Sequence, residues 1–192
     1  MRTMMSTITL CLLLAAGMAQ AQPAAAPPAT PAAVYEPVRL QAGVWDADIS
    51  FFDPASGERT GGAKGVQTNV LLANGHWVTN DLQVHGPEGA KGQPTFQGHG
   101  VWGWDPVARQ YVDTWVDTND GAVRTDYGFW NEQTRTLYWT ALQPDGNGHS
   151  VNYRMTEAYE GNDKRTLTFY QVALQSGRLV KLAEMRFTRR PG

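Results

Sequence analysis

The chain has 192 residues, of which 42% are hydrophobic and 18% charged, with seven tryptophans and a formal net charge of −2. This balance is typical of a globular domain and excludes a disordered chain. The basic side chains form no cluster apart from Arg186, Arg189 and Arg190 near the C-terminus. Nucleic acid and anionic membrane surfaces are therefore poor candidate partners.

The first 21 residues have the three parts of a secretory signal peptide. Arg2 supplies a positive charge, an apolar stretch follows from Ile8 to Met18, and Ala19-Gln20-Ala21 is a small-x-small cleavage site. The apolar stretch is shorter than the ~20 residues that a membrane-spanning helix needs. We therefore predict a signal peptide over residues 1–21 and a protein exported to the periplasm or the extracellular space, without a stable membrane anchor.

Cleavage after Ala21 removes Cys11, which is the only cysteine of the chain. The mature protein then has no disulfide, no thiolate zinc site and no cysteine nucleophile. Residues 22–38 consist largely of alanine and proline, a composition that cannot bury enough apolar surface to order itself. We predict a disordered linker over residues 22–38 and a single folded domain over residues 39–192.

The folded part has a hydrophobic period of two residues almost throughout. Trp45, Ala47, Ile49 and Phe51 alternate with polar neighbours, which is the pattern of a half-buried strand. Similar runs follow, separated by turn sequences such as Asp53-Pro54, Asn74-Gly75, Asp120-Gly121 and Gly161-Asn162. We expect these runs at residues 66–72, 76–84, 95–104, 109–116, 122–130, 135–142, 150–160, 165–175 and 178–189.

About ten strands joined by successive hairpins predict an all-β protein with an up-and-down antiparallel sheet. Closing this sheet into a β-barrel removes both exposed edges, and a β-sandwich is the alternative. No stretch of the folded part shows a helical period of 3.6 residues.

The alternation also predicts which side chains face the interior. Asn80 shares a face with Val78, Leu82 and Val84, and Glu157 shares one with Val151, Tyr153, Met155 and Tyr159, so both polar side chains should point inward. Two further inward faces are predicted, namely Phe96, Gly98, Gly100, Trp102 and Trp104, and Val123, Thr125, Tyr127 and Phe129. The runs at 109–116, 135–142 and 165–175 are mixed on both faces and give no prediction.

An aromatic interior with space at glycines and a few polar groups is typical of a small-molecule cavity. The candidate lining residues are Asn80, Trp102, Trp104, Tyr127, Tyr153 and Glu157. The favoured function is therefore the non-catalytic binding of a small, largely apolar ligand. One alternative is an enzyme that uses Glu157 as a buried acid or base. The other is a structural or partner-binding domain with a packed core and an exposed aromatic patch.

The sequence indicates neither a metal site nor a cofactor. The four histidines His76, His85, His99 and His149 are isolated from one another. Residues 98–103 fit G-x-G-x-x-G but lie within a predicted strand, whereas a dinucleotide fingerprint opens a helix. No serine lies in G-x-S-x-G.

Two pairs of carboxylates lie close enough in sequence for their spacing to bear on catalysis. Asp46 and Asp48 lie on the face of the strand that points away from Trp45. A solvated outer face therefore explains them better than a catalytic pair does. Asp113 and Asp117 would be ~13 Å apart on a straight strand, which is too far for a glycosidase pair. The sequence therefore predicts no catalytic residues.

Four short motifs in a fixed order resemble the bacterial "domain of unknown function 1579" family over residues 39–189. They are Gly43-Val44-Trp45, Gly103-Trp104-Asp105, Trp115-Val116-Asp117-Thr118 and Phe187-Thr188-Arg189. The sequence departs from the family pattern in having Trp104 where tyrosine is more usual and Thr118 where serine is.

The resemblance implies a fold and no established activity. The family is similar to the calycins, which are lipocalin-like barrels, and this favours the barrel over the sandwich. It also implies that Trp45 closes one barrel end, with Arg186 or Arg189 stacked on its indole ring. The structural motif residues would be Gly43, Trp45, Gly103, Asp105, Trp115, Asp117, Arg186 and Arg189. A related barrel family, the nitrobindins, binds haem through a histidine near the C-terminus, but residues 150–192 contain no histidine.

Overall fold

The structure of the protein is a computed structural model that describes residues 32–72, 74–86, 94–119, 121–144 and 149–191. The predicted signal peptide over residues 1–21, and residues 22–31 of the predicted linker, lie outside the described residues. Within the described ranges, no helix has the length and apolar character needed to cross a membrane.

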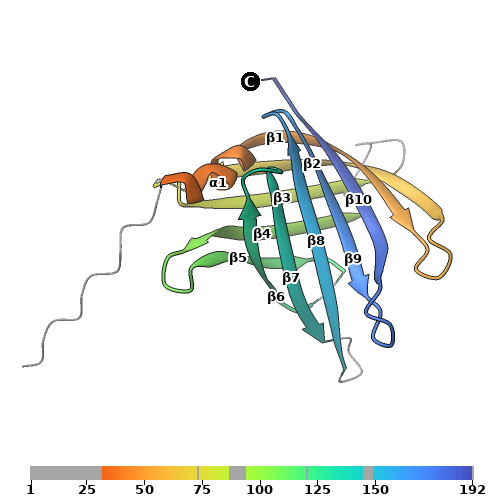
Figure 1. Ribbon diagram of the computed structural model, residues 1–192. Helices are drawn as coiled ribbons and strands as arrows, with labels where there is room; N and C mark the ends of the chain where they lie inside the picture. Colours follow the sequence, from red (N-terminus) through yellow and green to blue (C-terminus); the bar gives the residue numbers. More distant parts are fainter. Residues whose placement is uncertain (1–31, 73, 87–93, 120, 145–148, 192) are drawn as a thin grey trace, which may run out of the picture.

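Ten antiparallel strands form a closed barrel in which each strand pairs with the next in sequence (Figure 1). The last strand pairs with the first, with Arg189 opposite Trp45, and this pairing closes the sheet. The predicted up-and-down barrel is thus confirmed, and the sandwich alternative is not. The strands are β1 (Gly43–Phe52), β2 (Arg59–Leu71), β3 (Trp77–His85), β4 (Phe96–Asp105), β5 (Gln110–Asp117), β6 (Arg124–Asn131), β7 (Thr136–Pro144), β8 (Ser150–Glu160), β9 (Lys164–Val172) and β10 (Leu179–Arg189).

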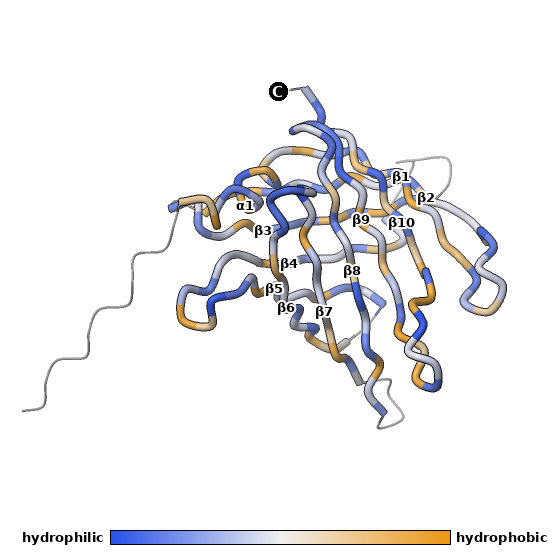
Figure 2. The backbone as a smooth tube through the Cα atoms, in the orientation of Figure 1, coloured by the Kyte–Doolittle hydropathy of each residue, from blue (hydrophilic) through white to orange (hydrophobic). Residues whose placement is uncertain are grey.

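The strands alternate between apolar and polar residues along much of their length, as the tube in Figure 2 shows. Local turn chemistry ends them. After β1, the Asp53 carboxylate accepts hydrogen bonds from the backbone N–H groups of Ala55 and Ser56, at 3.0 and 2.7 Å. Gly57 follows with a φ of +76°, a conformation that glycine adopts without steric cost.

The predicted inward faces are confirmed for β3, β4 and β8. Asn80, Trp102 and Glu157 are 8%, 2% and 4% exposed and point into the barrel. On β1 the inward face holds for Trp45, Ala47 and Ile49, whereas Phe51 near the strand end is exposed.

The predicted inward face of β6 is wrong. Tyr127 and Phe129 are 45% and 60% exposed, whereas Asp126 is only 2% exposed. The reversal has two physical causes. Asp126 is paired with Arg124, which lowers the cost of burying its charge. Gly128 leaves room for the Trp139 ring, since a Cβ atom at Gly128 would lie 2.5 Å from that ring.

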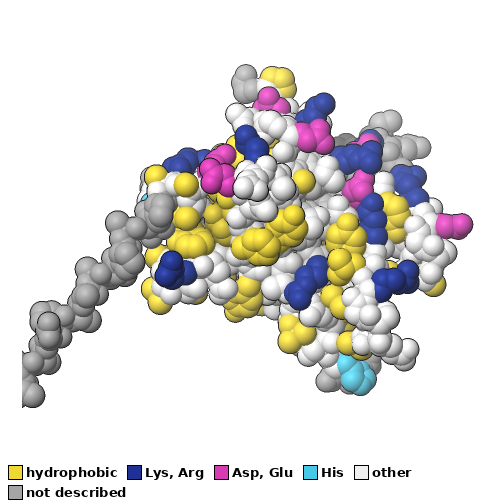
Figure 3. Space-filling view, viewed as in Figure 1, with side chains coloured by type: hydrophobic (Ala, Val, Ile, Leu, Met, Phe, Trp, Pro, Cys, Tyr) yellow, Lys and Arg dark blue, Asp and Glu magenta, His cyan; other side chains and the backbone are white. Residues whose placement is uncertain are grey.

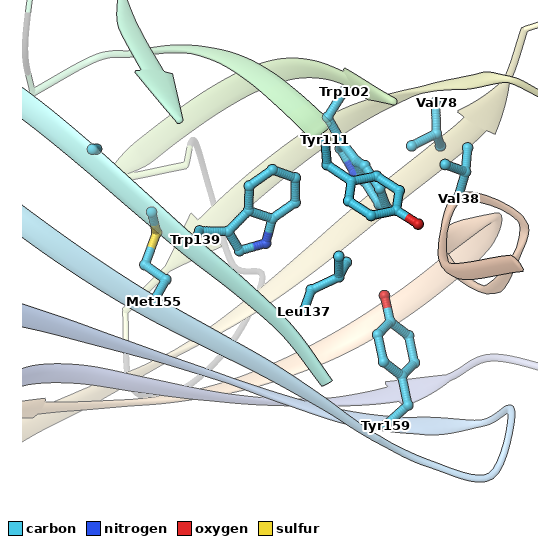
Figure 4. Close-up of a cluster of buried hydrophobic side chains, with 9 residues drawn as sticks. Val38, Val78, Trp102, Tyr111, Leu137, Trp139, Met155 and Tyr159 are labelled. Carbon is cyan, nitrogen blue, oxygen red and sulfur yellow. The ribbon is translucent and has the colours of Figure 1, made fainter. Parts of the chain in front are cut away.

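The three strands without a predicted face supply much of the interior. Tyr111 on β5 and Leu137, Trp139 and Ala141 on β7 are buried, and Arg165 on β9 is 2% exposed. The apolar ones among these side chains form a core cluster with Trp102, Met155 and Tyr159 (Figure 4). Its aromatic rings meet edge to face, with 5.4 Å between the centroids of Trp102 and Trp139.

Residues 32–38, predicted as the end of a disordered linker, are instead folded. They form a 3-10 helix η1 (Ala32–Tyr35) and the start of a short helix α1 (Glu36–Gln41). Val38 is fully buried and joins the core cluster beside Val78, and the Tyr111 hydroxyl donates to the Val34 carbonyl at 2.8 Å. The folded part therefore begins before residue 39, because these contacts fix the proline-containing segment across one end of the barrel.

Candidate functional site

The barrel contains a cavity of about 230 Å³. It extends from Gln41 at the end of α1 to Phe96, Asp117 and Arg124, which lie at strand ends on the opposite side of the barrel. Most of the wall is apolar. The apolar lining residues are Leu82, Phe96, Trp102, Trp115, Trp139, Met155, Leu167, Phe169, Ala183, Met185 and Phe187.

A buried polar cluster closes the end of the cavity beside α1. Gln41 donates from Nε2 to Glu157 at 2.6 Å and to the Tyr159 hydroxyl at 2.8 Å. Arg165 forms an ion pair with Glu157 and also donates to Gln67. All of these groups except Arg165 Nε find partners within the protein. This cluster, Gln41, Gln67, Glu157, Tyr159 and Arg165, is called the closed-end cluster below.

Trp45 lies next to two guanidinium groups. The Arg189 Cζ atom is 4.1 Å from the Trp45 ring centroid, and the Arg165 Cζ atom is 4.8 Å from it. Of the two arginines considered for this contact, Arg189 therefore makes it. Arg186 is instead exposed at the surface and is paired with Glu184 at 2.7 Å.

A second polar group lies on the facing strands β5 and β6. Asp113 and Asp126 are direct partners in the register of these strands, and both line the cavity. Arg124 binds Asp126 through Nε and Nη2 at distances of 2.8 to 3.1 Å. The Oδ1 atom of Asp113 is enclosed and has no hydrogen-bond partner among the described residues. Asp113 and Asp126 are called the carboxyl pair below.

Burial raises the pKa of Asp113 well above its ordinary value, and the neighbouring charge of Asp126 raises it further. Burial also raises the pKa of Asp126, but Arg124 opposes this shift with its charge and its hydrogen bonds. The pair therefore retains a proton to a higher pH than separate carboxyl groups would, and Asp113 is the member that carries it.

We predict that Asp113→Asn stabilises the protein at neutral pH. The folded state retains a proton on Asp113 that the unfolded state releases above its ordinary pKa of 3.8, so stability falls as pH rises from that value through the raised pKa. Asparagine resembles the protonated acid and removes this loss. The melting temperature at pH 7 should rise by about 3 °C or more, since 1 kcal/mol corresponds to ~2–4 °C in a domain of this size.

Thermal unfolding followed by circular dichroism between pH 3.5 and 8 measures the effect. The gain should shrink toward pH 3.5, where both states of the wild type are protonated at Asp113. Asp46→Asn is the matched control, because the pKa of Asp46 is lowered by Arg190 at the exposed outer surface. A loss of stability in Asp113→Asn at pH 7 would contradict the shared proton.

Three of the six predicted ligand residues line the cavity, namely Asn80, Trp102 and Glu157. Asn80 is already paired within the protein. With its amide oxygen toward Trp102, it accepts from Nε1 at 3.1 Å and donates to the Asn69 side chain at 3.2 Å. Glu157 is likewise held by the closed-end cluster.

The other three predicted ligand residues lie elsewhere. Tyr127 is on the outer face of β6. Trp104 packs against the core cluster and lines a second hollow together with Tyr127 and Phe129. Tyr153 is partly buried against the core, with its ring 5.0 Å from that of Phe169, and does not line the cavity. Figure 3 shows groups of hydrophobic side chains on the outer face over β5 to β8.

The residues of the four sequence motifs contact backbone and side chains that hold the fold together. A Cβ atom at position 43 would lie 2.6 Å from Nη1 of Arg189, so glycine leaves room for this guanidinium group. Arg189 donates to the backbone carbonyls of Leu40 and Ala42. Gly103 lies against the backbone of His76 and the ring of Trp77. Other motif residues make hydrogen bonds to near neighbours in sequence. Asp105 accepts from two N–H groups of its turn, and Trp115 Nε1 donates to Asp117 at 2.9 Å.

Sequence reasoning missed Arg124, Asp126, Asp113 and Arg165. Asp113 was compared only with Asp117 on its own strand, whereas its partner Asp126 lies on the next strand. The available signal was that Arg124 and Asp126 lie two residues apart on β6 and therefore share one face of the strand. His85 is 8% exposed, and its Nδ1 atom has no partner in the described part of the chain.

A closed ten-stranded up-and-down barrel with a short helix at one end and an internal cavity is a calycin-like β-barrel. The chain belongs to the DUF1579 family, described as "Protein of unknown function", whose profile matches residues 30–189. This confirms the resemblance that the four motifs indicated. Among curated proteins, none matches the chain in sequence.

Two solved structures share the fold at low sequence identity. Rv2717c from M. tuberculosis matches with a TM-score of 0.59 and 13% identity, over 81% of this chain and 94% of that protein. The S-type phycobiliprotein lyase CPES from Guillardia theta matches with a TM-score of 0.53 and 7% identity, over 81% of this chain and 91% of the lyase. At these identities the two structures support the fold and nothing further.

Proposed function

We propose that the protein is an exported, non-catalytic binder of a small, largely apolar ligand, which occupies the cavity inside the barrel. The observation that carries this proposal is the cavity itself, about 230 Å³ in volume and walled mainly by aromatic and aliphatic side chains. An apolar cavity of about 150 Å³ is sufficient to bind benzene. A ligand with one or two small rings, or a short branched chain, therefore fits this volume.

The alternative of a packed, ligand-free domain is not favoured by this cavity. Protein interiors are packed as densely as organic crystals, and voids larger than a water molecule are few. Leaving such a volume empty loses the contacts that would fill it. A binding function supplies those contacts from a ligand.

The alternative of an enzyme that uses Glu157 is also less favoured. A general acid or base needs to lie within hydrogen-bond reach of the reacting group. Glu157 already accepts from Arg165 and Gln41 at the closed end, where both donors come from the protein. Its position is that of a structural anchor for α1 and β9.

The proposal predicts that Ala183→Leu, which adds three carbons to the cavity wall, abolishes binding of a small apolar probe. Ala183 is 8% exposed and lines the cavity. Toluene and benzyl alcohol are suitable probes, and calorimetric titration of the purified protein measures their affinity. The wild type should bind at least one of them, and the variant should bind it at least tenfold more weakly.

Ala108→Leu is the matched control, because the same substitution falls on an exposed turn residue. Native mass spectrometry of the mature protein adds an independent readout, since a natural ligand retained through purification would appear as an added mass. The proposal fails if the wild type binds neither probe and carries no added mass. Equal affinities in the wild type and Ala183→Leu would place binding outside the cavity.

A further inference from the structure

We infer that the natural ligand carries a basic amine, and that the carboxyl pair is the site that holds its ammonium group. This inference rests on the proposed binding function and names the chemistry of the ligand. It is carried by the charge balance of the cavity wall and by the unpartnered oxygen of Asp113.

The cavity wall contains more acidic than basic side chains. Asp113, Asp117, Asp126 and Glu157 line it, against Arg124 and Arg165. Each arginine already has one acidic partner, since Arg165 pairs with Glu157 and Arg124 pairs with Asp126. Asp113 is a further acidic group of the wall, and it lies on β5 two residues from the buried Tyr111.

Asp113 has the geometry of an anchor. Asp113 lines the cavity wall, and its enclosed Oδ1 atom receives no hydrogen bond from a donor group of the described residues. A buried acceptor without a donor is unfavourable and is uncommon in folded proteins. A ligand ammonium group has three donors, so one N–H can reach Asp113 and another can reach Asp126, its register partner.

The walls beside the carboxyl pair suit an organic cation. Trp115 follows Asp113 on the same inward face of β5, and Trp102, Trp139 and Phe169 also line the cavity. Aromatic faces attract ammonium groups and at the same time accommodate the apolar part of an amine. An inorganic ion is a poorer fit, because no three metal-binding side chains converge among the described residues.

An anionic ligand would lack a free partner. Both arginines of the wall are engaged by carboxylates, and a carboxylate ligand would lie beside Asp113, Asp126 and Glu157. Two negative charges repel strongly in a buried site, because the effective dielectric constant there is low. The structure therefore favours amines over acids of the same shape.

Binding should be linked to proton release. The charged groups that face Asp113 are Asp126 and Arg124 from β6 and Glu157 from β8. When an ammonium ion binds, the added positive charge favours the ionised form of Asp113, so the shared proton leaves to the solvent. When the neutral amine enters, the same proton is transferred from the carboxyl group to the amine nitrogen. The complex is identical in both cases.

Three probes of one shape test the inference: benzylamine, benzyl alcohol and benzoate. Calorimetric titration of the wild type at pH 7 should show benzylamine binding at least tenfold more tightly than benzyl alcohol, with benzoate the weakest. Repeating the benzylamine titration in two buffers of different ionisation enthalpy should show proton release. Asp113→Asn should lose tenfold or more in benzylamine affinity and keep its affinity for benzyl alcohol, whereas Asp46→Asn should match the wild type for all three.

The outcomes separate the two proposals. If benzyl alcohol binds as tightly as benzylamine, or benzoate binds best, the cavity binds ligands but the amine inference is overturned. If Asp113→Asn binds benzylamine as well as the wild type does, another group holds the amine and the assignment of the carboxyl pair is wrong. If none of the probes, toluene included, binds the wild type, the binding function itself fails and the inference fails with it.

Discussion

Replacing Arg165 by methionine is expected to lower the free energy of unfolding by about 3–5 kcal/mol, because it leaves Glu157 buried without its charge partner. Arg165 and Glu157 have side chains only 2% and 5% exposed. The guanidinium group of Arg165 also lies 3.8 Å from the Phe187 ring centroid and donates to Gln67. A domain with the usual stability of about 5–15 kcal/mol would lose a large part of it.

Urea denaturation followed by tryptophan fluorescence measures this loss. Arg186→Met is the matched control, because Arg186 is exposed and its pairing with Glu184 is screened by water. The double variant Arg165→Met with Glu157→Gln should recover part of the lost stability, since it removes the unpaired charge as well. If Arg165→Met lowers the free energy of unfolding no more than the control does, the ion pair does not hold the closed end together. The same conclusion follows if the effects of Arg165→Met and Glu157→Gln are simply additive.

Replacing Trp45 by alanine should cost a similar amount, about 3–5 kcal/mol, through the cavity that it leaves. Trp45 is fully buried in the second core cluster, beside Ile49, Leu82 and Phe187. Its Nε1 atom donates to the Gln41 carbonyl at 2.8 Å, which ties the end of α1 to β1. Its ring also faces the two guanidinium groups described above.

Trp45→Phe separates packing from hydrogen bonding. Phenylalanine keeps an aromatic ring for the arginines and fills most of the space, but it cannot donate to Gln41. We expect this variant to lose less than half as much stability as the alanine variant in the same urea titration. If the two variants are equally unstable, the hydrogen bond to Gln41 carries the effect, and the ring packing assigned to Trp45 is wrong.

The cavity and the closed-end cluster together explain why the polar residues inside the barrel have different roles. Glu157 and Asn80 were the polar side chains that alternation placed inside, and both are satisfied by the protein. Asp113 was not singled out by alternation, yet among the described residues that line the cavity it is the one with a buried side-chain oxygen that lacks a hydrogen-bond partner. A polar side chain that faces a cavity is a candidate ligand contact only when the fold leaves it unpaired.

Part of the candidate site followed from local sequence. The period of two places Asn80, Trp102 and Glu157 on apolar faces, and a strand exposes such faces to one side only. The same rule failed for Tyr127, because Arg124 and Asp126 neutralise one another inside the barrel while aromatic side chains occupy the outer face of β6. Hydrophobicity alone does not distinguish an inward ion pair from an outward polar face.

The sequence by itself determined that the protein is a meander of about ten strands, because turn residues and period-two alternation are local properties. Its short motifs also indicated the DUF1579 family. Only the tertiary structure decided that residues 32–41 close one barrel end, that Arg165 rather than Arg186 joins Arg189 near Trp45, and that Asp113 faces Asp126. Each of these facts depends on which residues of different segments come opposite one another when the barrel closes. The register of the strands and the packing of α1 set those pairings. Neither can be predicted from the spacing of residues along a single strand.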